Sequence, residues 1–132
     1  MLLNCQFRSA VLRRNTAIMV MIPTPEEENA PVRKDMKVLY LLHGMSDDHT
    51  IWQRRTSVER YAAAHNLAII MPGVNHSFYC NEYYGERYWD FVSQELPQVM
   101  QQFFRLSDKP EDTFVAGLSM GGYGAMKLAL TY

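Results

Sequence analysis

The stretch Gly117-Leu118-Ser119-Met120-Gly121 decides the fold of this chain. It lies where an apolar, β-prone run over residues 113–118 changes into a helix-like run over residues 120–131. A serine between two such glycines, at a sharp turn from strand to helix, is the pattern of a nucleophile elbow. A hydroxyl is a weak nucleophile, so the turn has to expose it to a base and to a substrate carbonyl. We therefore expect Ser119 to be a catalytic nucleophile; the alternative is an ordinary glycine-rich turn.

The elbow glycines are expected to have a mechanical role. Gly117 and Gly121 flank the turn where the backbones of strand and helix come closest. A Cβ atom at either position would collide with the other element.

The composition limits the classes of protein to which the chain can belong. The chain has 132 residues, of which 48% are hydrophobic and 20% charged, as in one ordinary globular domain. The net charge of −1, without clusters of one sign, predicts neither a nucleic-acid nor a membrane partner. No apolar run reaches transmembrane length and the N-terminus is a poor signal peptide, so we expect a cytoplasmic protein. Cys5 and Cys80 lie in no metal-type spacing, which predicts free thiols. The sequence implies no metal and no organic cofactor.

Apolar runs and helical periodicity alternate along the chain. Strands are expected over residues 2–12 and 16–22, as an antiparallel hairpin, and over 37–42, 67–71 and 112–118. Helices are expected over residues 56–65, 86–105 with a kink or break at Pro97, and 120–131. The pattern predicts an α/β fold in a single domain over residues 1–132, with a mostly parallel sheet, an N-terminal antiparallel hairpin and helices on both faces.

Three local features refine this prediction. A capping box, Thr56-Ser57-Val58-Glu59, is expected to open the first of these helices. Residues 23–31, which include Glu26, Glu27 and Glu28, predict an exposed loop. Residues 74–85 form an irregular segment rich in aromatic residues, which either walls a substrate pocket or packs over the sheet edge.

A second candidate for chemistry follows the strand at residues 37–42. There His43-Gly44-Met45 forms a turn at the carboxyl end of the strand. In open α/β sheets, ligands bind outside these carboxyl ends.

Several segments, in the same order, carry a resemblance to a known family: residues 38–45, Trp52, residues 95–97 and residues 117–124. Together they resemble the esterase D and tributyrin esterase family of the α/β-hydrolases, and most closely the bacterial tributyrin (acetyl) esterases. This family also includes S-formylglutathione hydrolases, feruloyl esterases and mycolyltransferases. The resemblance covers essentially the whole chain and implies an α/β-hydrolase fold, truncated here after the helix that follows the elbow.

The resemblance also implies roles for individual residues. Ser119 would accept the acyl group, and the backbone N–H groups of Met45 and Met120 would form the oxyanion hole. One such donor contributes about 3 to 4 kcal/mol to transition-state stabilisation. His43 is implied to stabilise its turn rather than to act as the base. The residues expected as a possible pocket wall are His43, Gly44, Phe78 and Tyr79.

The sequence departs from a working enzyme after the elbow. In this fold the triad follows the chain order nucleophile, acid, base. All four histidines precede Ser119, and no Asp, Glu or His follows it. We expect the chain to be the N-terminal half of a longer hydrolase, nearly inactive alone, with His76 the least improbable substitute base. An unpaired edge on the elbow strand predicts self-association or association with the missing half.

The leading hypothesis is a serine carboxylic-ester hydrolase that acts on short-chain acyl esters through an acyl-enzyme on Ser119. The alternatives are an S-formylglutathione hydrolase or an acyltransferase of the same family, or a non-catalytic α/β-hydrolase-like assembly module. The same serine chemistry serves all the enzymes, whereas an assembly module has no reason to keep a reactive hydroxyl.

Overall fold

The structure is a computed structural model that describes residues 1–25 and 27–132; Glu26, in the predicted acidic loop, lies outside the described residues. The five strands are β1 (Leu2–Arg8), β2 (Asn15–Met21), β3 (Lys37–Leu42), β4 (Leu67–Pro72) and β5 (Thr113–Gly117). The α-helices are α1 (Ile51–Arg55), α2 (Val58–Ala64), α3 (Tyr88–Asp90), α4 (Leu96–Phe103) and α5 (Met120–Thr131). A π-helical turn, η1 (Phe91–Glu95), joins α3 to α4, and a 3-10 turn, η2 (Pro110–Asp112), precedes β5.

The strands form one mixed sheet in the order β1-β2-β4-β3-β5. The hairpin β1–β2 is antiparallel and joins β4 antiparallel, whereas β3 pairs parallel with both β4 and β5. The predicted α/β fold, with a mostly parallel centre and an antiparallel hairpin at its start, is therefore confirmed. Because β3, β4 and β5 are parallel, their carboxyl ends lie at one edge of the sheet.

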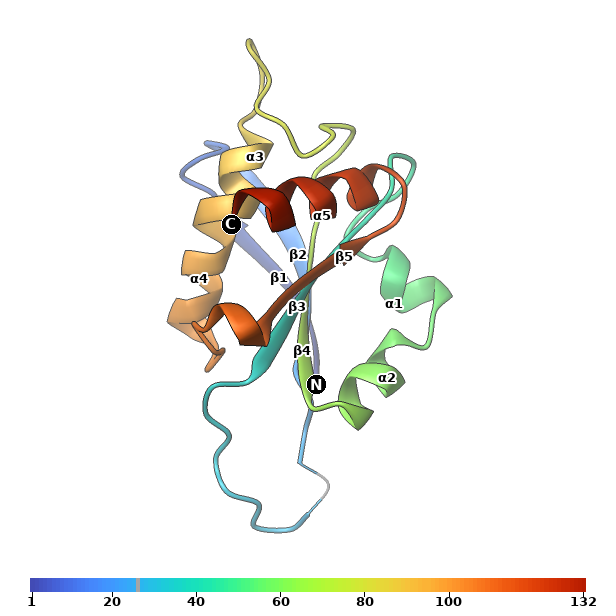
Figure 1. The fold of residues 1–132 in the computed structure, drawn as a ribbon, viewed down its shortest axis with the longest axis vertical. Coiled ribbons are helices and arrows are strands. Elements are labelled where there is room, and N and C mark those ends of the chain that lie inside the picture. Colours follow the sequence, from blue (N-terminus) through green and yellow to red (C-terminus); the bar gives the residue numbers. More distant parts are fainter. Residues whose placement is uncertain (26) are drawn as a thin grey trace.

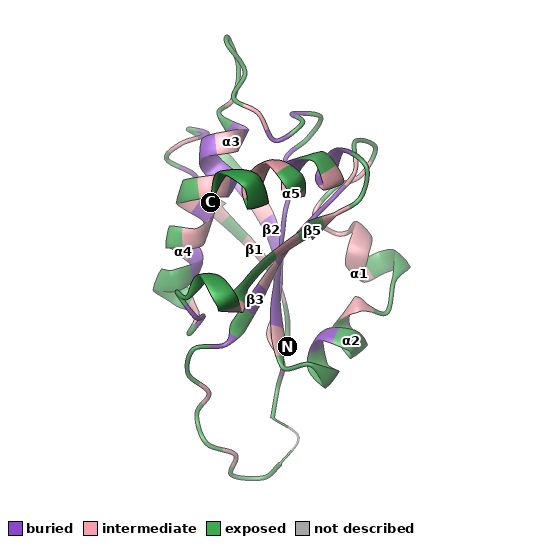
Figure 2. Ribbon diagram, in the orientation of Figure 1, coloured by how far each residue is buried: buried purple, intermediate pink, exposed green. Residues whose placement is uncertain are grey.

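Helices cover both faces of the sheet, as predicted (Figure 1). Alternate residues of the strands point to opposite faces, which produces two cores. The larger core packs Val38 and Ile70 under α5 and the helical stretch that contains α4. The smaller core packs Leu41 and Ile69 under α1 and α2. Burial is therefore concentrated in β2, β3 and β4, while β1 and β5 are largely exposed (Figure 2).

The predicted kink at Pro97 takes the form of a π-helical turn. Residues 88–103 form a continuous helical stretch, shorter at both ends than the predicted 86–105. The Leu96 N–H donates to Phe91 O, five residues back, just before Pro97. Proline lacks an N–H and its ring collides with the preceding turn, so the helix widens there instead of ending.

The predicted capping box is wrong in detail. Helix α2 begins at Val58, and its N-cap residue, Ser57, makes no side-chain cap. The Thr56 hydroxyl donates to Trp52 O and accepts from the Val58 N–H at 3.2 Å. Thr56 is thus engaged at the end of α1, a short helix that the sequence patterns did not predict. Among the described residues, no helix is long and apolar enough to cross a membrane.

Candidate active site

The candidate site is built on the turn between β5 and α5. Ser119 lies at this turn with φ 55° and ψ −117°, and it is exposed to solvent. A residue other than glycine in such a conformation costs about 1 to 3 kcal/mol, which the surrounding structure has to offset. Two backbone hydrogen bonds hold the turn: Gly121 N–H to Leu118 O at 2.8 Å and Tyr123 N–H to Ser119 O at 3.0 Å. The elbow therefore presents a hydroxyl at the carboxyl edge of the sheet.

The two elbow glycines lie in places that a side chain cannot share. A Cβ atom on Gly117 would lie 2.3 Å from Gly121 O. A Cβ atom on Gly121 would lie 2.3 Å from Leu42 O and 2.8 Å from His43 O. Gly121 therefore lets α5 approach the end of the neighbouring strand β3, as well as its own elbow strand.

The residues His43, Gly44 and Met45, which we call the oxyanion turn after the role expected of the Met45 N–H, lie against the elbow. A Cβ atom built on Gly44 would be 3.4 Å from Leu118 O and 3.7 Å from the Ser119 Cβ. Within residues 1–25 and 27–132, the backbone N–H groups of Met45 and Met120 have no backbone acceptor. The Met45 side chain is half exposed, whereas that of Met120 is buried. Two backbone donors without a backbone acceptor in the described chain thus belong to the residues that follow Gly44 and Ser119, and an oxyanion hole would need donors of this kind.

The His43 ring is fixed in one tautomer by its partners. His43 is buried, and its Nε2 accepts the Val74 N–H at 3.0 Å. Because Nε2 is an acceptor, Nδ1 carries the proton and donates to Gly44 O at 2.7 Å. Burial lowers the pKa of His43, so the ring is neutral at pH 7.

This hydrogen bond orients the peptide that carries the Met45 N–H. The Gly44 carbonyl and the Met45 N–H belong to the same peptide group, which is trans, so the two point in opposite directions. His43 holds the carbonyl and thereby directs the N–H to the opposite side. Both ring nitrogens of His43 have backbone partners, so the ring is not placed to accept a proton from Ser119.

The aromatic segment after β4 contributes one surface residue and one buried residue. Phe78 is 46% exposed and its ring meets that of Tyr123, one helical turn after Ser119, edge to face at 6.3 Å. Tyr79 is fully buried, and its hydroxyl donates to His43 O at 2.9 Å. Of the residues expected in the pocket wall, Phe78 is therefore at the surface, whereas Tyr79 and His43 are buried. Tyr123 was not predicted; only its position four residues after Ser119 signals that it lies near the site.

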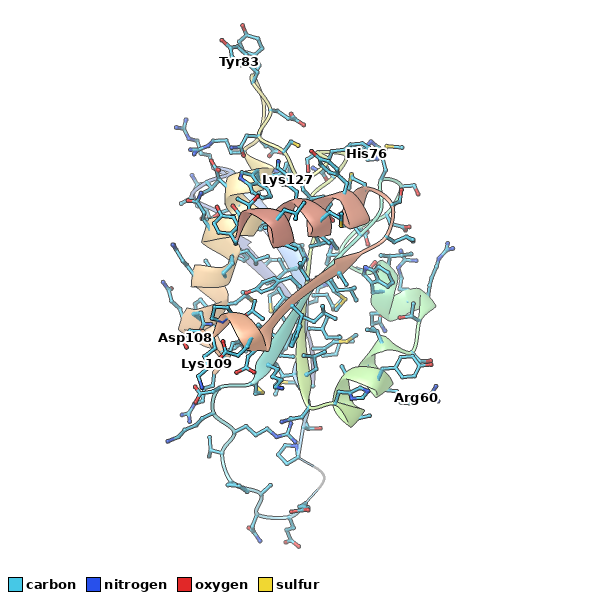
Figure 3. All side chains as sticks on the ribbon, in the orientation of Figure 1. Arg60, His76, Tyr83, Asp108, Lys109 and Lys127 are labelled. Atoms are coloured by element: carbon cyan, nitrogen blue, oxygen red, sulfur yellow. The ribbon has the colours of Figure 1, made fainter. Side chains whose placement is uncertain are left out.

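The other histidines do not complete a triad. Within the described residues, only His43 has side-chain hydrogen bonds, and both partners are backbone groups. His65 ends α2, and His76 is exposed on the segment after β4 (Figure 3).

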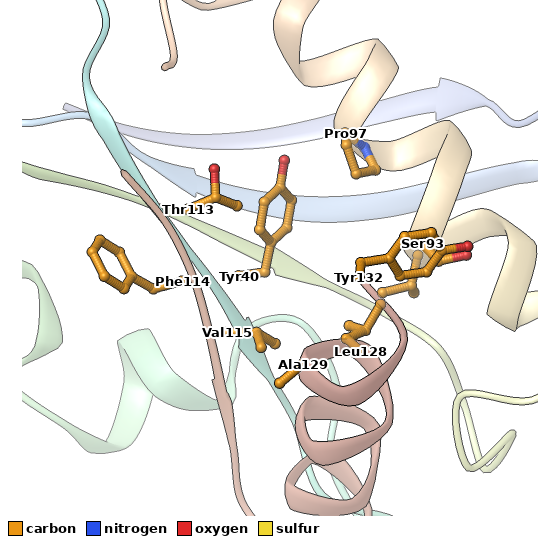
Figure 4. Close-up of a pocket in the computed structure, with 10 residues that line it drawn as sticks. Tyr40, Ser93, Pro97, Thr113, Phe114, Val115, Leu128, Ala129 and Tyr132 are labelled. Atoms are coloured by element: carbon orange, nitrogen blue, oxygen red, sulfur yellow. The ribbon is translucent and has the colours of Figure 1, made fainter. Parts of the chain in front are cut away.

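A cavity of about 420 Å³ lies away from Ser119, beside the outer edge of β5 (Figure 4). Its walls are mainly apolar and come from β5, the last turns of α5 and the start of α4, with Phe114, Leu128 and Tyr132 among them. The Ser93 hydroxyl, in the π-helical turn, lines the cavity and has no hydrogen-bond partner within the described chain. The cavity thus lies beside the outer edge strand β5, and Ser119 is not among the residues that line it.

The mixed sheet, the strained serine between β5 and α5, and the adjacent oxyanion turn define the chain as a protein of the α/β-hydrolase class. Comparison with known proteins places it within this class. Residues 9–132 match the family model described as "Putative esterase", and the chain belongs to this family.

Its relatives include an acetyl esterase of Caldicellulosiruptor saccharolyticus, 32% identical over 99% of this chain and 51% of that protein. Among solved structures, the substrate-bound fluorophosphonate-binding serine hydrolase FphF of Staphylococcus aureus is 41% identical, with a TM-score of 0.92 over 99% of this chain and 52% of that one. The S-formylglutathione hydrolase FrmB of the same organism is also 41% identical, with a TM-score of 0.86 over 99% and 52%. The chain therefore spans about half the length of the relatives that it matches.

Proposed function

We propose that this chain carries the nucleophile and the oxyanion hole of a serine carboxylic-ester hydrolase that acts on short-chain acyl esters. The observation that carries the proposal is the exposed Ser119 with a positive φ of 55°, next to the turn that carries the Met45 N–H and to the Met120 N–H, neither of which has a backbone acceptor among the described residues. A residue is kept in such a conformation only where the surrounding structure enforces it, and such strain clusters at active sites.

The proposed reaction has two steps. The Ser119 Oγ attacks the ester carbonyl carbon, its proton passes to a base, and the carbonyl oxygen gains negative charge between the two N–H groups. The tetrahedral intermediate then expels the alcohol, which takes up a proton, and leaves an acyl group on Ser119. Water attacks this acyl-enzyme by the same route, releases the carboxylic acid and restores the serine.

We propose that the base and its acidic partner belong to polypeptide that follows α5 in the intact protein. In this fold both come after the nucleophile in the chain. The neutral, fully bonded His43 is unsuited to the task. The same additional polypeptide, or a second copy of this chain, is proposed to cover the outer edge of β5 and the adjacent cavity, because an unpaired strand edge favours pairing.

A second candidate activity is hydrolysis of S-formylglutathione, a thioester. It is favoured by the 41% identity with an enzyme of that name, and the chemistry at Ser119 would be the same. The ratio of kcat/KM for S-formylglutathione to that for p-nitrophenyl acetate separates the two activities. A ratio well above one favours the thioesterase, and a ratio well below one favours the simple esterase.

The test uses the protein as its source produces it. Wild type and Ser119→Ala are compared for p-nitrophenyl acetate turnover and for labelling by a fluorophosphonate, with Ser46→Ala as the matched control in the loop after β3. We expect Ser119→Ala to lose labelling and at least about 10³-fold in kcat, while Ser46→Ala retains both. Full activity in Ser119→Ala would reject the proposal, and absence of turnover and labelling in all three would favour the assembly module.

A further inference from the structure

We propose that Tyr79 is a positioning residue for the oxyanion turn: its hydroxyl fixes the His43 carbonyl, so that the following peptide presents the Met45 N–H to the substrate. This inference rests on the proposed esterase function. It concerns a residue that lies beneath the site and does not touch the substrate.

Gly44 is the flexible point that makes such a residue necessary. A glycine has no Cβ to restrict its backbone, so the peptides on its two sides rotate easily unless both are held. The peptide after Gly44 is held by the His43 ring, through Nδ1 and Gly44 O. The peptide before Gly44 contains the His43 carbonyl, and Tyr79 donates its hydroxyl proton to that oxygen at 2.9 Å. The Asp47 N–H also donates to Gly44 O at 3.2 Å, so the peptides on both sides of Gly44 are held by hydrogen bonds, and within the described part of the chain only Tyr79 holds the one before it.

Tyr79 is itself held at its backbone and at its ring. Its N–H donates to the Ser77 Oγ at 3.2 Å, and its carbonyl accepts from the Lys127 Nζ of α5 at 3.2 Å. The ring occupies the space that a side chain on Gly124 would need, since a Cβ atom there would be 2.6 Å away. These contacts, two of them with α5, fix the position from which the Tyr79 hydroxyl reaches the oxyanion turn.

The backbone around Tyr79 is strained in the way that functional segments often are. Phe78 and Tyr79 are successive residues with φ of 51° and 53°. Each such conformation costs about 1 to 3 kcal/mol in a residue other than glycine. This double turn places Phe78 outside and the Tyr79 hydroxyl inside. Burial also raises the pKa of Tyr79, so the hydroxyl keeps its proton and remains a donor throughout the neutral range.

The chain offers a matched control for the loss of this hydroxyl. Tyr88 is also buried in the larger core, and its hydroxyl accepts hydrogen bonds from Arg14 and, at 2.8 Å, from the Asn75 Nδ2. Tyr79→Phe and Tyr88→Phe each remove one bonded hydroxyl from the same core. Only the first loses a contact with the oxyanion turn.

Two readouts are taken on each variant of the intact protein. The first is kcat and KM for p-nitrophenyl acetate. For Tyr79→Phe we expect kcat to fall about 10- to 100-fold, with KM within about twofold of wild type. The reason is that the Met45 N–H would be misplaced, and only the transition state uses this donor. The second is hydrogen exchange of the Asp47 amide, which donates to Gly44 O at 3.2 Å and reports on the turn without any need for activity. We expect about tenfold faster exchange in Tyr79→Phe and little change in Tyr88→Phe.

Wild-type kcat in Tyr79→Phe, or equal effects of the two substitutions on kcat, would overturn the inference. Unchanged Asp47 exchange in Tyr79→Phe would overturn it as well. If the wild-type protein showed no turnover that depends on Ser119, the esterase proposal would fail, while the exchange comparison would still decide whether Tyr79 holds the turn.

Discussion

Ser119 and Gly121 show how single residues make the site possible. Ser119 accepts an unfavourable backbone conformation, and the close approach of α5 to β3 at Gly121 helps to enforce it. The sequence predicted the need for glycine at the elbow, since the motif implies a tight turn. It did not predict that Gly121 faces the end of β3, because that contact depends on the order of strands in the sheet.

We expect Gly121→Ala to destabilise the protein by about 2 to 3 kcal/mol, because the added methyl group would meet the backbone of Leu42, which cannot move aside. Gly122→Ala is the control. Its Cβ atom would lie 3.5 Å from Gly117 O, an ordinary contact, and alanine within a helix is more favourable than glycine by about 0.5 to 1 kcal/mol. Urea unfolding midpoints measure both effects, and equal midpoints for the two variants would contradict the packing described here.

His43 leads to a prediction about pH. Burial lowers its pKa below the ordinary value of 6.5, so the unfolded chain takes up the proton first as the pH falls. The contribution of His43 to the free energy of unfolding is therefore complete above about pH 6.5 and is lost as the pH drops towards the folded pKa. We expect the urea midpoint to decrease as the pH is lowered from about 7.5 to about 5.5, and to decrease less in His43→Asn. An imidazole signal of His43 that titrates at or above 6.5 would contradict this prediction.

At the scale of elements, what the sequence could predict depended on burial. The continuous apolar runs of β3 and β4 were predicted nearly to the residue, because strands covered on both faces must be apolar throughout. Helix α5 was predicted at its observed bounds. The short helix α1 was missed because it is only five residues long, which is too short for a helical period to be recognised. The bond between Tyr79 and His43 was also beyond prediction, since it joins residues 36 apart across two loops.

Strand β5 is an edge strand that is open to association. It is the last strand in the sheet order, and Phe114 on it is 43% exposed. We expect the 132-residue chain to self-associate with increasing concentration, and Phe114→Lys to raise the monomer fraction, because a charge on an edge strand opposes pairing. Phe103→Lys, an equally large change at a 75% exposed position on α4, should leave association unchanged. Sedimentation velocity measures the monomer fraction of both variants. Equal monomer fractions would show that the chain associates through a surface other than β5.

On the scale of the whole molecule, the fold brings the carboxyl ends of two parallel strands and the beginning of α5 to a common point. The parallel strands β3 and β5 end side by side, and the loops that follow them supply the oxyanion turn and Ser119. The hairpin β1–β2 and the helices other than α5 contribute no residue to the oxyanion turn or to the elbow. The sequence pattern predicted that both turns follow strands whose carboxyl ends hold ligand sites, and the family resemblance implied that the two turns act together.

The central claim is that Ser119 becomes acylated. The most direct measurement is to mix the protein, as its source produces it, with p-nitrophenyl acetate, quench the mixture in acid within milliseconds to seconds, and locate any acetyl group by peptide mass spectrometry. We expect a transient acetyl group on Ser119, formed at the rate of the p-nitrophenol burst and absent from Ser119→Ala. Turnover that proceeds with the acetyl group on another residue, or that persists in Ser119→Ala, would contradict this claim.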